Sequence, residues 1–107
     1  MTTISLKKEM VGRSFHYELS ATGHAGYAPV GQDIVCSAVS ILFFTLANAL
    51  SDSGVGELDV KLDPGDSTIT CICSCNDIEV ESLFKFAMVG LELLEEQYPD
   101  NVEIFDN

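Results

Sequence analysis

The chain has 107 residues, 47% of them hydrophobic, and a formal net charge of −12 at pH 7 with only five Lys and Arg. This length predicts one domain, residues 1–107, and the hydrophobic content excludes a disordered chain. The shortage of cations argues against a nucleic-acid partner, because phosphate binding needs a basic patch. The charge fits a basic protein partner and, equally well, a plain acidic surface.

The N-terminus and the cysteines indicate a cytoplasmic protein. The opening residues, MTTISLKKEM, contain no apolar run, so we expect no signal peptide. Four cysteines without an export signal are expected to remain reduced thiols. Residues 34–50 carry no charge, but they are few for a membrane span and include Ser, Thr and Asn. A buried helix is therefore favoured, and no membrane partner is expected.

The first half of the chain reads as two strands followed by a helix. TISLKKE and SFHYELS both alternate apolar and polar residues, and Gly12 between them marks a turn, which predicts an antiparallel hairpin. The helix is expected to begin near Asp33 and to end near Ser51–Asp52, just before Gly54.

The second half repeats this order. ELDVKLD and STITCICSC alternate in the same way, and the turn sequence DPGD at 63–66 joins them into a second hairpin. A helix with an apolar stripe follows from about Asp77 to Gln97, before Pro99, and VEIF at 102–105 is expected to add a last strand. The order ββαββα(β) predicts an α+β fold: a two-layer sandwich with a mainly antiparallel sheet and two helices on one face.

The first helix is apolar on nearly all sides. A two-layer domain buries only one side of a helix, so the remaining apolar side needs another partner. A homodimer formed through this helix supplies that partner. The other half of the same chain is the alternative.

Cys36 and His24 are the candidates for chemistry. With Asp33 as N-cap, Cys36 is the third helical residue, where free backbone N–H groups and the helix dipole stabilise a thiolate. A thiolate also needs a proton acceptor and donor, and His24 ends the second strand just before a Gly-rich loop that leads to this helix. The alternatives are a small buried cysteine and an exposed loop histidine.

Asp33 and Ser40 each have two interpretations. Asp33 either caps the helix or orients His24 as the third member of a triad, and capping is favoured because a nearby carboxylate would oppose a thiolate. Ser40, one turn after Cys36, either supports the site or bonds a carbonyl in the preceding turn. We expect no metal and no cofactor. Cys71, Cys73 and Cys75 share one strand face and lack a second ligand pair, so buried thiols are favoured over zinc.

The segment GHAGYAPVGQDIVCSAVSIL resembles the signature of the ribosomal-processing cysteine protease family, often called Prp or YsxB-like. That signature is Gly-His-Ala, a variable loop, then Gly-x-Asp-Ile-Val-Cys-x-Ala-Val-Ser. The matching residues here are Gly23, His24, Ala25, Gly31, Asp33, Ile34, Val35, Cys36, Ala38, Val39 and Ser40. Chain length, element order and the acidic second helix also agree, and Ser37, where Ala is common, is a small departure.

The resemblance implies a cytoplasmic, homodimeric endopeptidase. It would remove the N-terminal extension of the large-subunit ribosomal protein L-twenty-seven, cutting after a pair of aromatic residues, with Cys36 as nucleophile and His24 as general base and acid. We expect backbone N–H groups of residues 33–36 to stabilise the oxyanion. Loop 25–32 would close over the substrate on glycine hinges. The loop residues singled out for substrate binding are Gly23, Gly26, Tyr27, Gly31 and Gln32.

Two other functions remain open. One is a non-catalytic module that binds ribosomal proteins or assists ribosome assembly, with the Cys–His pair purely structural. The other is a redox-responsive or metal-responsive protein that uses the three strand cysteines.

Overall fold

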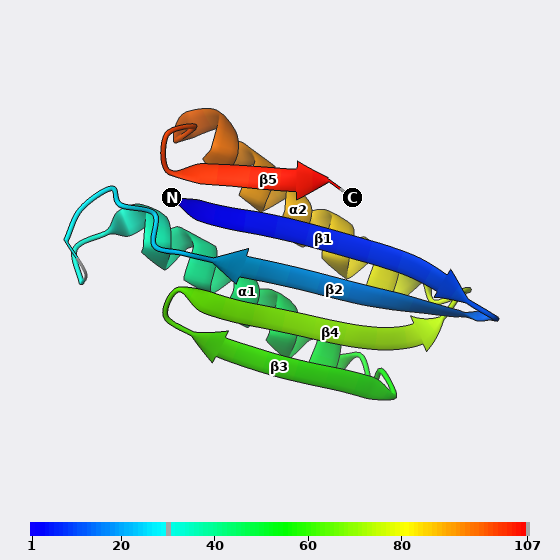
Figure 1. Ribbon diagram of the computed structural model, residues 1–107. Coiled ribbons are helices and arrows are strands. Elements are labelled where there is room, and N and C mark those ends of the chain that lie inside the picture. The colour runs from blue at the N-terminus through cyan, green and yellow to red at the C-terminus, as the bar shows by residue number, and fades with distance from the viewer. Residues whose placement is uncertain (30, 107) are drawn as a thin grey trace.

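The structure is a computed structural model that describes residues 1–29 and 31–106; Val30, within the expected loop, lies outside the described residues. The helices and strands follow the predicted order, and the last strand is present (Figure 1). They are β1 (Thr2–Val11), β2 (Ser14–Thr22), α1 (Ile34–Asp52), β3 (Glu57–Asp63), β4 (Asp66–Ser74), α2 (Ile78–Gln97) and β5 (Val102–Asp106). The predicted ββαββαβ fold is confirmed.

The strands form one sheet in the order β3-β4-β2-β1-β5. All neighbouring pairs are antiparallel except β1 and β5, which run parallel because α2 carries the chain back along the sheet before β5 begins. The two hairpins meet through β2 and β4, and Thr22 pairs with Asp66. This register brings the β3–β4 turn, residues 63–66, to the end of the sheet where β2 stops.

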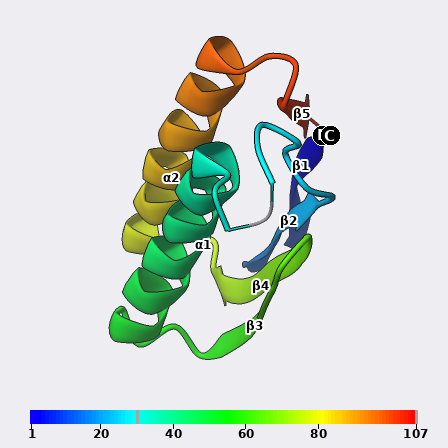
Figure 2. The same ribbon diagram turned by 90° about the vertical axis from the view of Figure 1, so that its left-hand side faces the viewer.

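Both helices cover the same face of the sheet, so the molecule has two layers (Figure 2). Tyr17 of β2 stacks on Phe84 of α2, with ring centroids 4.4 Å apart and an interplanar angle of 7°. The helices also pack against each other, and a Cβ atom on Gly90 of α2 would lie 2.8 Å from a methyl group of Leu42. The largest fully buried side chains come from both layers: Ile4, Leu19, Val35, Phe43, Leu50, Ile69, Cys71, Val80, Phe84, Leu91 and Val102.

The cysteine-rich strand is part of this core. Cys71 and Cys73 are buried in β4, and burial raises the pKa of the Cys71 thiol to about 11, so this thiol stays protonated at neutral pH. In the described part of the chain, no three Cys, His, Asp or Glu side chains are grouped as a metal site would require. The edge strand β3 is less well covered: Leu58 and Leu62 are half-buried and Val60 is exposed, because the sheet ends there.

By length and composition alone, α1 could cross a membrane, with a mean hydropathy of 2.0. A core helix passes the same test. Here α1 packs on the sheet and on α2, and six of its residues are buried: Val35, Val39, Phe43, Leu46, Ala47 and Leu50.

Candidate active site

His24 lies two residues beyond Thr22, the last residue of β2, where the chain makes a sharp turn. Gly23 has φ +87°, and a Cβ atom at this position would collide with the carbonyl oxygen of Met1. The N–H of Gly23 donates to the carbonyl of Gly65 at 2.9 Å, and the Thr2 hydroxyl donates to the carbonyl of Gly23 at 3.1 Å. The backbone before His24 is therefore fixed to both the N-terminus and the β3–β4 turn.

The backbone after His24 is fixed as well. Ala25 is 1% exposed, and its carbonyl accepts a hydrogen bond from the Asn101 side chain at 3.0 Å. Its N–H donates to the sulfur of Cys36 at 3.3 Å. His24 thus projects from a short anchored segment, and the peptide group that follows it contacts the thiol directly.

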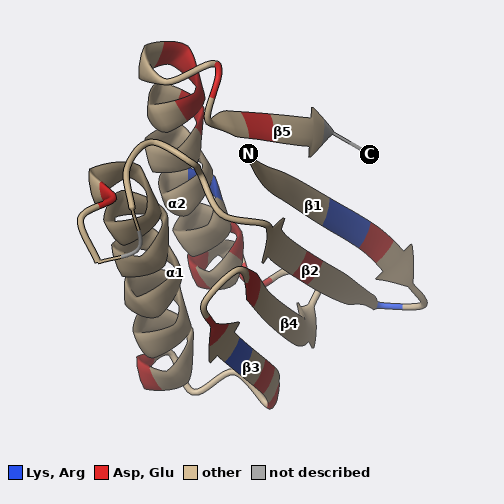
Figure 3. Cartoon of the chain, turned by 60° about the vertical axis from the view of Figure 1, so that its left-hand side comes forward, with Lys and Arg blue, Asp and Glu red and all other residues tan. Residues whose placement is uncertain are grey.

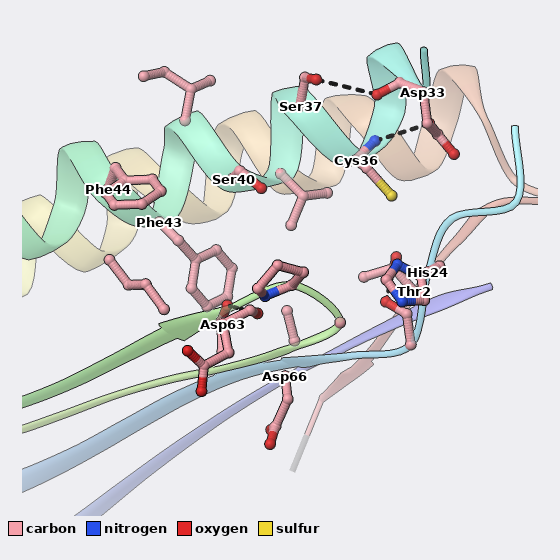
Figure 4. Close-up of a pocket in the computed structure, with 18 of the residues that line it drawn as sticks. Thr2, His24, Asp33, Cys36, Ser37, Ser40, Phe43, Phe44, Asp63 and Asp66 are labelled. Atoms are coloured by element: carbon pink, nitrogen blue, oxygen red, sulfur yellow. Dashed lines mark hydrogen bonds between the residues drawn. The ribbon is translucent and has the colours of Figure 1, made fainter. Parts of the chain in front are cut away.

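Cys36 occupies the third helical position of α1, and Asp33 caps this helix as the sequence indicates. One oxygen of Asp33, Oδ1, accepts from the N–H groups of Val35 and Cys36, each at 3.0 Å. The bond from Cys36 is marked in Figure 4. Of the backbone N–H groups of residues 33–36 that were expected to stabilise an oxyanion, those of Val35 and Cys36 bond the cap instead.

The other oxygen of Asp33 anchors the loop before α1. Oδ2 accepts from the N–H of Tyr27 at 3.0 Å and of Ala28 at 3.4 Å. Burial acts to raise the pKa of Asp33, but hydrogen bonds from the four N–H groups, led by Cys36, outweigh it and lower this pKa below its ordinary value. A carboxylate engaged in this way favours the capping role over the orientation of His24.

A cavity of about 540 Å³ lies between α1, the end of β2 and the β3–β4 turn. Cys36 and His24 both line it, and in Figure 4 the Cys36 thiol points from the helix toward His24. Among the described residues, no hydrogen bond joins these two side chains. The larger apolar side chains that line the cavity from α1 and β3 are Val39, Ile41, Phe43, Phe44 and Leu62. This arrangement suits a nucleophilic thiol beside a proton carrier, next to an apolar groove.

The remaining site candidates divide into two groups. Ser40 is exposed, and it lines the cavity together with Gly23, Gly26 and Gly31. The hydrogen bond to a carbonyl of the preceding turn, considered for Ser40, is made instead by the Ser37 hydroxyl to the carbonyl of Asp33. Tyr27 and Gln32 lie outside the lining. Tyr27 packs edge-on against Tyr98 with ring centroids 5.4 Å apart, and the N–H of Gln32 donates to the carbonyl of Pro29 at 2.9 Å.

The model of the cysteine protease Prp family matches residues 1–103 of the chain. The chain belongs to this family. The ribosomal processing cysteine protease Prp of Bacillus subtilis is 32% identical over 91 residues, 80% of this chain and 81% of that protein. The protein of the same name from Staphylococcus aureus is 30% identical over 84 residues, 77% of this chain and 78% of its own length.

A solved structure extends the likeness to the fold. The crystal structure of the essential ribosomal processing protease Prp from Staphylococcus aureus, in complex with a covalently linked product peptide, matches with a TM-score of 0.83. It is 25% identical, and the match covers all of both chains. The family and the enzyme class expected from the GHA and DIVC segments, a cysteine protease, are confirmed.

For this Prp family member, the sequence did not reveal one wall of the cavity. Asp63, Pro64, Gly65 and Asp66 line it, although DPGD at 63–66 carried only a turn signal. That signal fixes the turn, with Gly65 at φ +74°. The turn lies next to His24 because β4 pairs with β2, and no local sequence pattern predicts this pairing.

Proposed function

We propose that this protease acts on a ribosomal protein with Cys36 as nucleophile and His24 as general base and acid. The observation that carries the proposal is that one cavity is lined by both side chains, with the Ala25 N–H donating to the Cys36 sulfur. The covalently linked product peptide in the Staphylococcus aureus structure supports it, since a nucleophilic residue forms such a bond.

The reaction follows from these roles. His24 takes the proton of Cys36, and the sulfur forms a bond to the scissile carbonyl carbon. His24 then gives the proton to the leaving amine as the C–N bond breaks, and water hydrolyses the thioester to restore the thiol. The hydrogen bond from the Ala25 N–H holds the sulfur of Cys36 next to the backbone that carries His24.

The proposed substrate is the N-terminal extension of ribosomal protein L-twenty-seven. A cut after two aromatic residues requires an apolar groove beside the thiol, and Phe43, Phe44 and Ile41 offer one. The chain has 17 Asp and Glu against five Lys and Arg, and the acidic residues are spread over both helices and the strands (Figure 3). The resulting net charge of −12 favours encounter with a basic protein.

The proposed substrate gate is the middle of the loop. Gly26 and Gly31 have φ +73° and +90°, and a Cβ atom on either would meet no atom within 4 Å. They are free to serve as hinges, whereas Gly23 is packed against the backbone of Met1. Asp33 holds the described structure by binding the N–H groups of Tyr27 and Ala28, so a moving loop breaks these two bonds.

We also propose a cytoplasmic homodimer. Much of α1 is covered by the sheet and α2, as the alternative interpretation allowed, but Ile34 at its start remains 56% exposed. The outer side of α2 adds Phe86, Val89 and Leu93, each at least 51% exposed. A second copy on the outer face of both helices would cover this apolar surface.

The experiment is cleavage of a synthetic peptide that spans the aromatic pair of the extension. Cys36→Ala and His24→Ala, checked for an intact fold by circular dichroism, should each lower kcat/KM by about 10³-fold or more. Cys75→Ala removes another thiol and should cleave normally. Normal cleavage by Cys36→Ala would refute the proposal. A peptide that binds without being cut by the wild-type protein would favour the ribosome-assembly module.

A further inference from the structure

We infer that the β3–β4 turn, residues 63–66, holds the catalytic histidine in position and that Gly65 is a positioning residue for His24. This inference rests on the proposed role of His24. Gly65 lies on another hairpin, 41 positions along the chain from His24. Its position beside the imidazole gives the DPGD segment a function that a plain turn would not have.

The end of the imidazole ring lies beside Gly65. A Cβ atom built on Gly65 would lie 2.9 Å from Nε2, 3.1 Å from Cε1 and 3.4 Å from Cδ2 of His24. Real Cβ atoms do not approach neighbours as closely as the first of these distances. The absence of a side chain at Gly65 therefore leaves room for the imidazole beside the turn.

A second contact fixes the turn relative to the histidine. The carbonyl of Gly65 accepts the N–H of Gly23 at 2.9 Å, one residue before His24. The same glycine thus lies beside the imidazole and binds the backbone from which that side chain projects. A side chain at position 65 would meet the movable end of His24, so the imidazole would be displaced while the fold persisted.

Displacement of a catalytic group is costly even when it is small. A misplacement of about 1 Å lowers rates by about 10²-fold, because the reacting atoms leave their productive geometry. Gly65→Ala is therefore expected to lower kcat by about 10- to 100-fold with a smaller effect on KM.

The chain offers a matched control. Gly65 has φ +74°, so any L-residue there also strains the backbone. Gly12, in the β1–β2 turn at the opposite end of the sheet (Figure 1), has φ +63° and no atom within 4 Å of a built Cβ. Gly12→Ala introduces similar strain without touching His24. A purely structural role for Gly65 predicts the same behaviour for both variants.

The experiment compares wild type, Gly65→Ala and Gly12→Ala by peptide cleavage, by the rate of Cys36 alkylation with iodoacetamide, and by the NMR signals of the His24 ring. We expect kcat, the alkylation rate and the ring signals to change in Gly65→Ala alone. A kcat/KM for Gly65→Ala within twofold of that for Gly12→Ala, with unchanged ring signals, would overturn the inference.

The experiment also distinguishes a folding defect of Gly65→Ala from a failure of the proposed function. If Gly65→Ala is poorly folded, Gly65→Asn takes its place with Gly12→Asn as control, because Asn tolerates positive φ yet still carries the Cβ atom. We expect kcat, the alkylation rate and the ring signals to change in Gly65→Asn and not in Gly12→Asn. If wild type and Gly12→Ala both fail to cleave, the proposed function fails, while alkylation and ring signals still report whether Gly65 positions His24.

Discussion

Asp33 shows how one residue can shape both sides of a site. Its two oxygens bind the first turn of α1, which carries Cys36, and the loop that follows His24. The charge is satisfied entirely by backbone N–H groups, which stabilise the ionised form. Asp33 thus couples the ionised state of a carboxylate to the order of the loop.

A pH dependence follows. The pKa of Asp33 is lowered in the folded protein, so as pH falls the unfolded chain takes up this proton first. The stabilisation is fully present above the ordinary aspartate pKa and is lost as pH falls through the lower folded pKa. Asp33→Asn keeps one oxygen to cap the helix but replaces the acceptor of the Tyr27 and Ala28 N–H groups with an amide NH2, and should cost about 1 kcal/mol of unfolding free energy at neutral pH.

Urea unfolding of wild type and Asp33→Asn between pH 7 and pH 3 measures this. The difference in unfolding free energy should shrink toward acid pH, since protonated Asp33 loses the advantage of its charge. A difference that stays constant over the whole range would show that the charge of Asp33 contributes nothing.

At the scale of elements, the end of β2 is fixed by a glycine with no room for a side chain. In Gly23→Ala the new methyl group would meet the backbone carbonyl of Met1, which cannot swing aside as a side chain can. With the added strain of φ +87°, we expect a loss of about 2 kcal/mol or more.

Gly12→Ala is the reference for this loss as well. It introduces the strain of positive φ in an open turn and should cost only about 1 kcal/mol. Equal losses in denaturant unfolding would mean that the contact of Gly23 with the N-terminus is unimportant.

The elements could be predicted because their signals are local. Asp33 and Asp77 mark the two helix starts as caps, and the period-two pattern gives the strands. The environment of His24 could not be predicted, because it depends on β4 lying next to β2. The exposure of Val60 has the same origin, since a strand pattern does not say which strand ends the sheet.

The competition for backbone N–H groups at the start of α1 was equally hard to foresee. An aspartate at a helix start predicts a cap, and a cysteine three residues later suggests free donors for an oxyanion. Both expectations draw on the same N–H groups, and the distances of 3.0 Å from Val35 and Cys36 to Oδ1 show that the cap binds them.

At the scale of the whole molecule, the outer face of the two helices is expected to hold a second copy. Phe86 is 79% exposed on this face, so Phe86→Glu should raise the dimer dissociation constant by at least about tenfold. Phe105→Glu alters an exposed phenylalanine of β5 and should leave the dimer intact. Sedimentation velocity over a concentration series distinguishes them, and equal behaviour of both variants would exclude this face.

The central claim is that Cys36 is the nucleophile and that His24 activates it. Its most direct test is intact-protein and peptide mass spectrometry after reaction with a peptide chloromethyl ketone that ends in two aromatic residues. We predict a single adduct on Cys36, formed much more slowly in His24→Ala. An adduct on Cys75 or another thiol, or an unchanged rate in His24→Ala, would contradict the account.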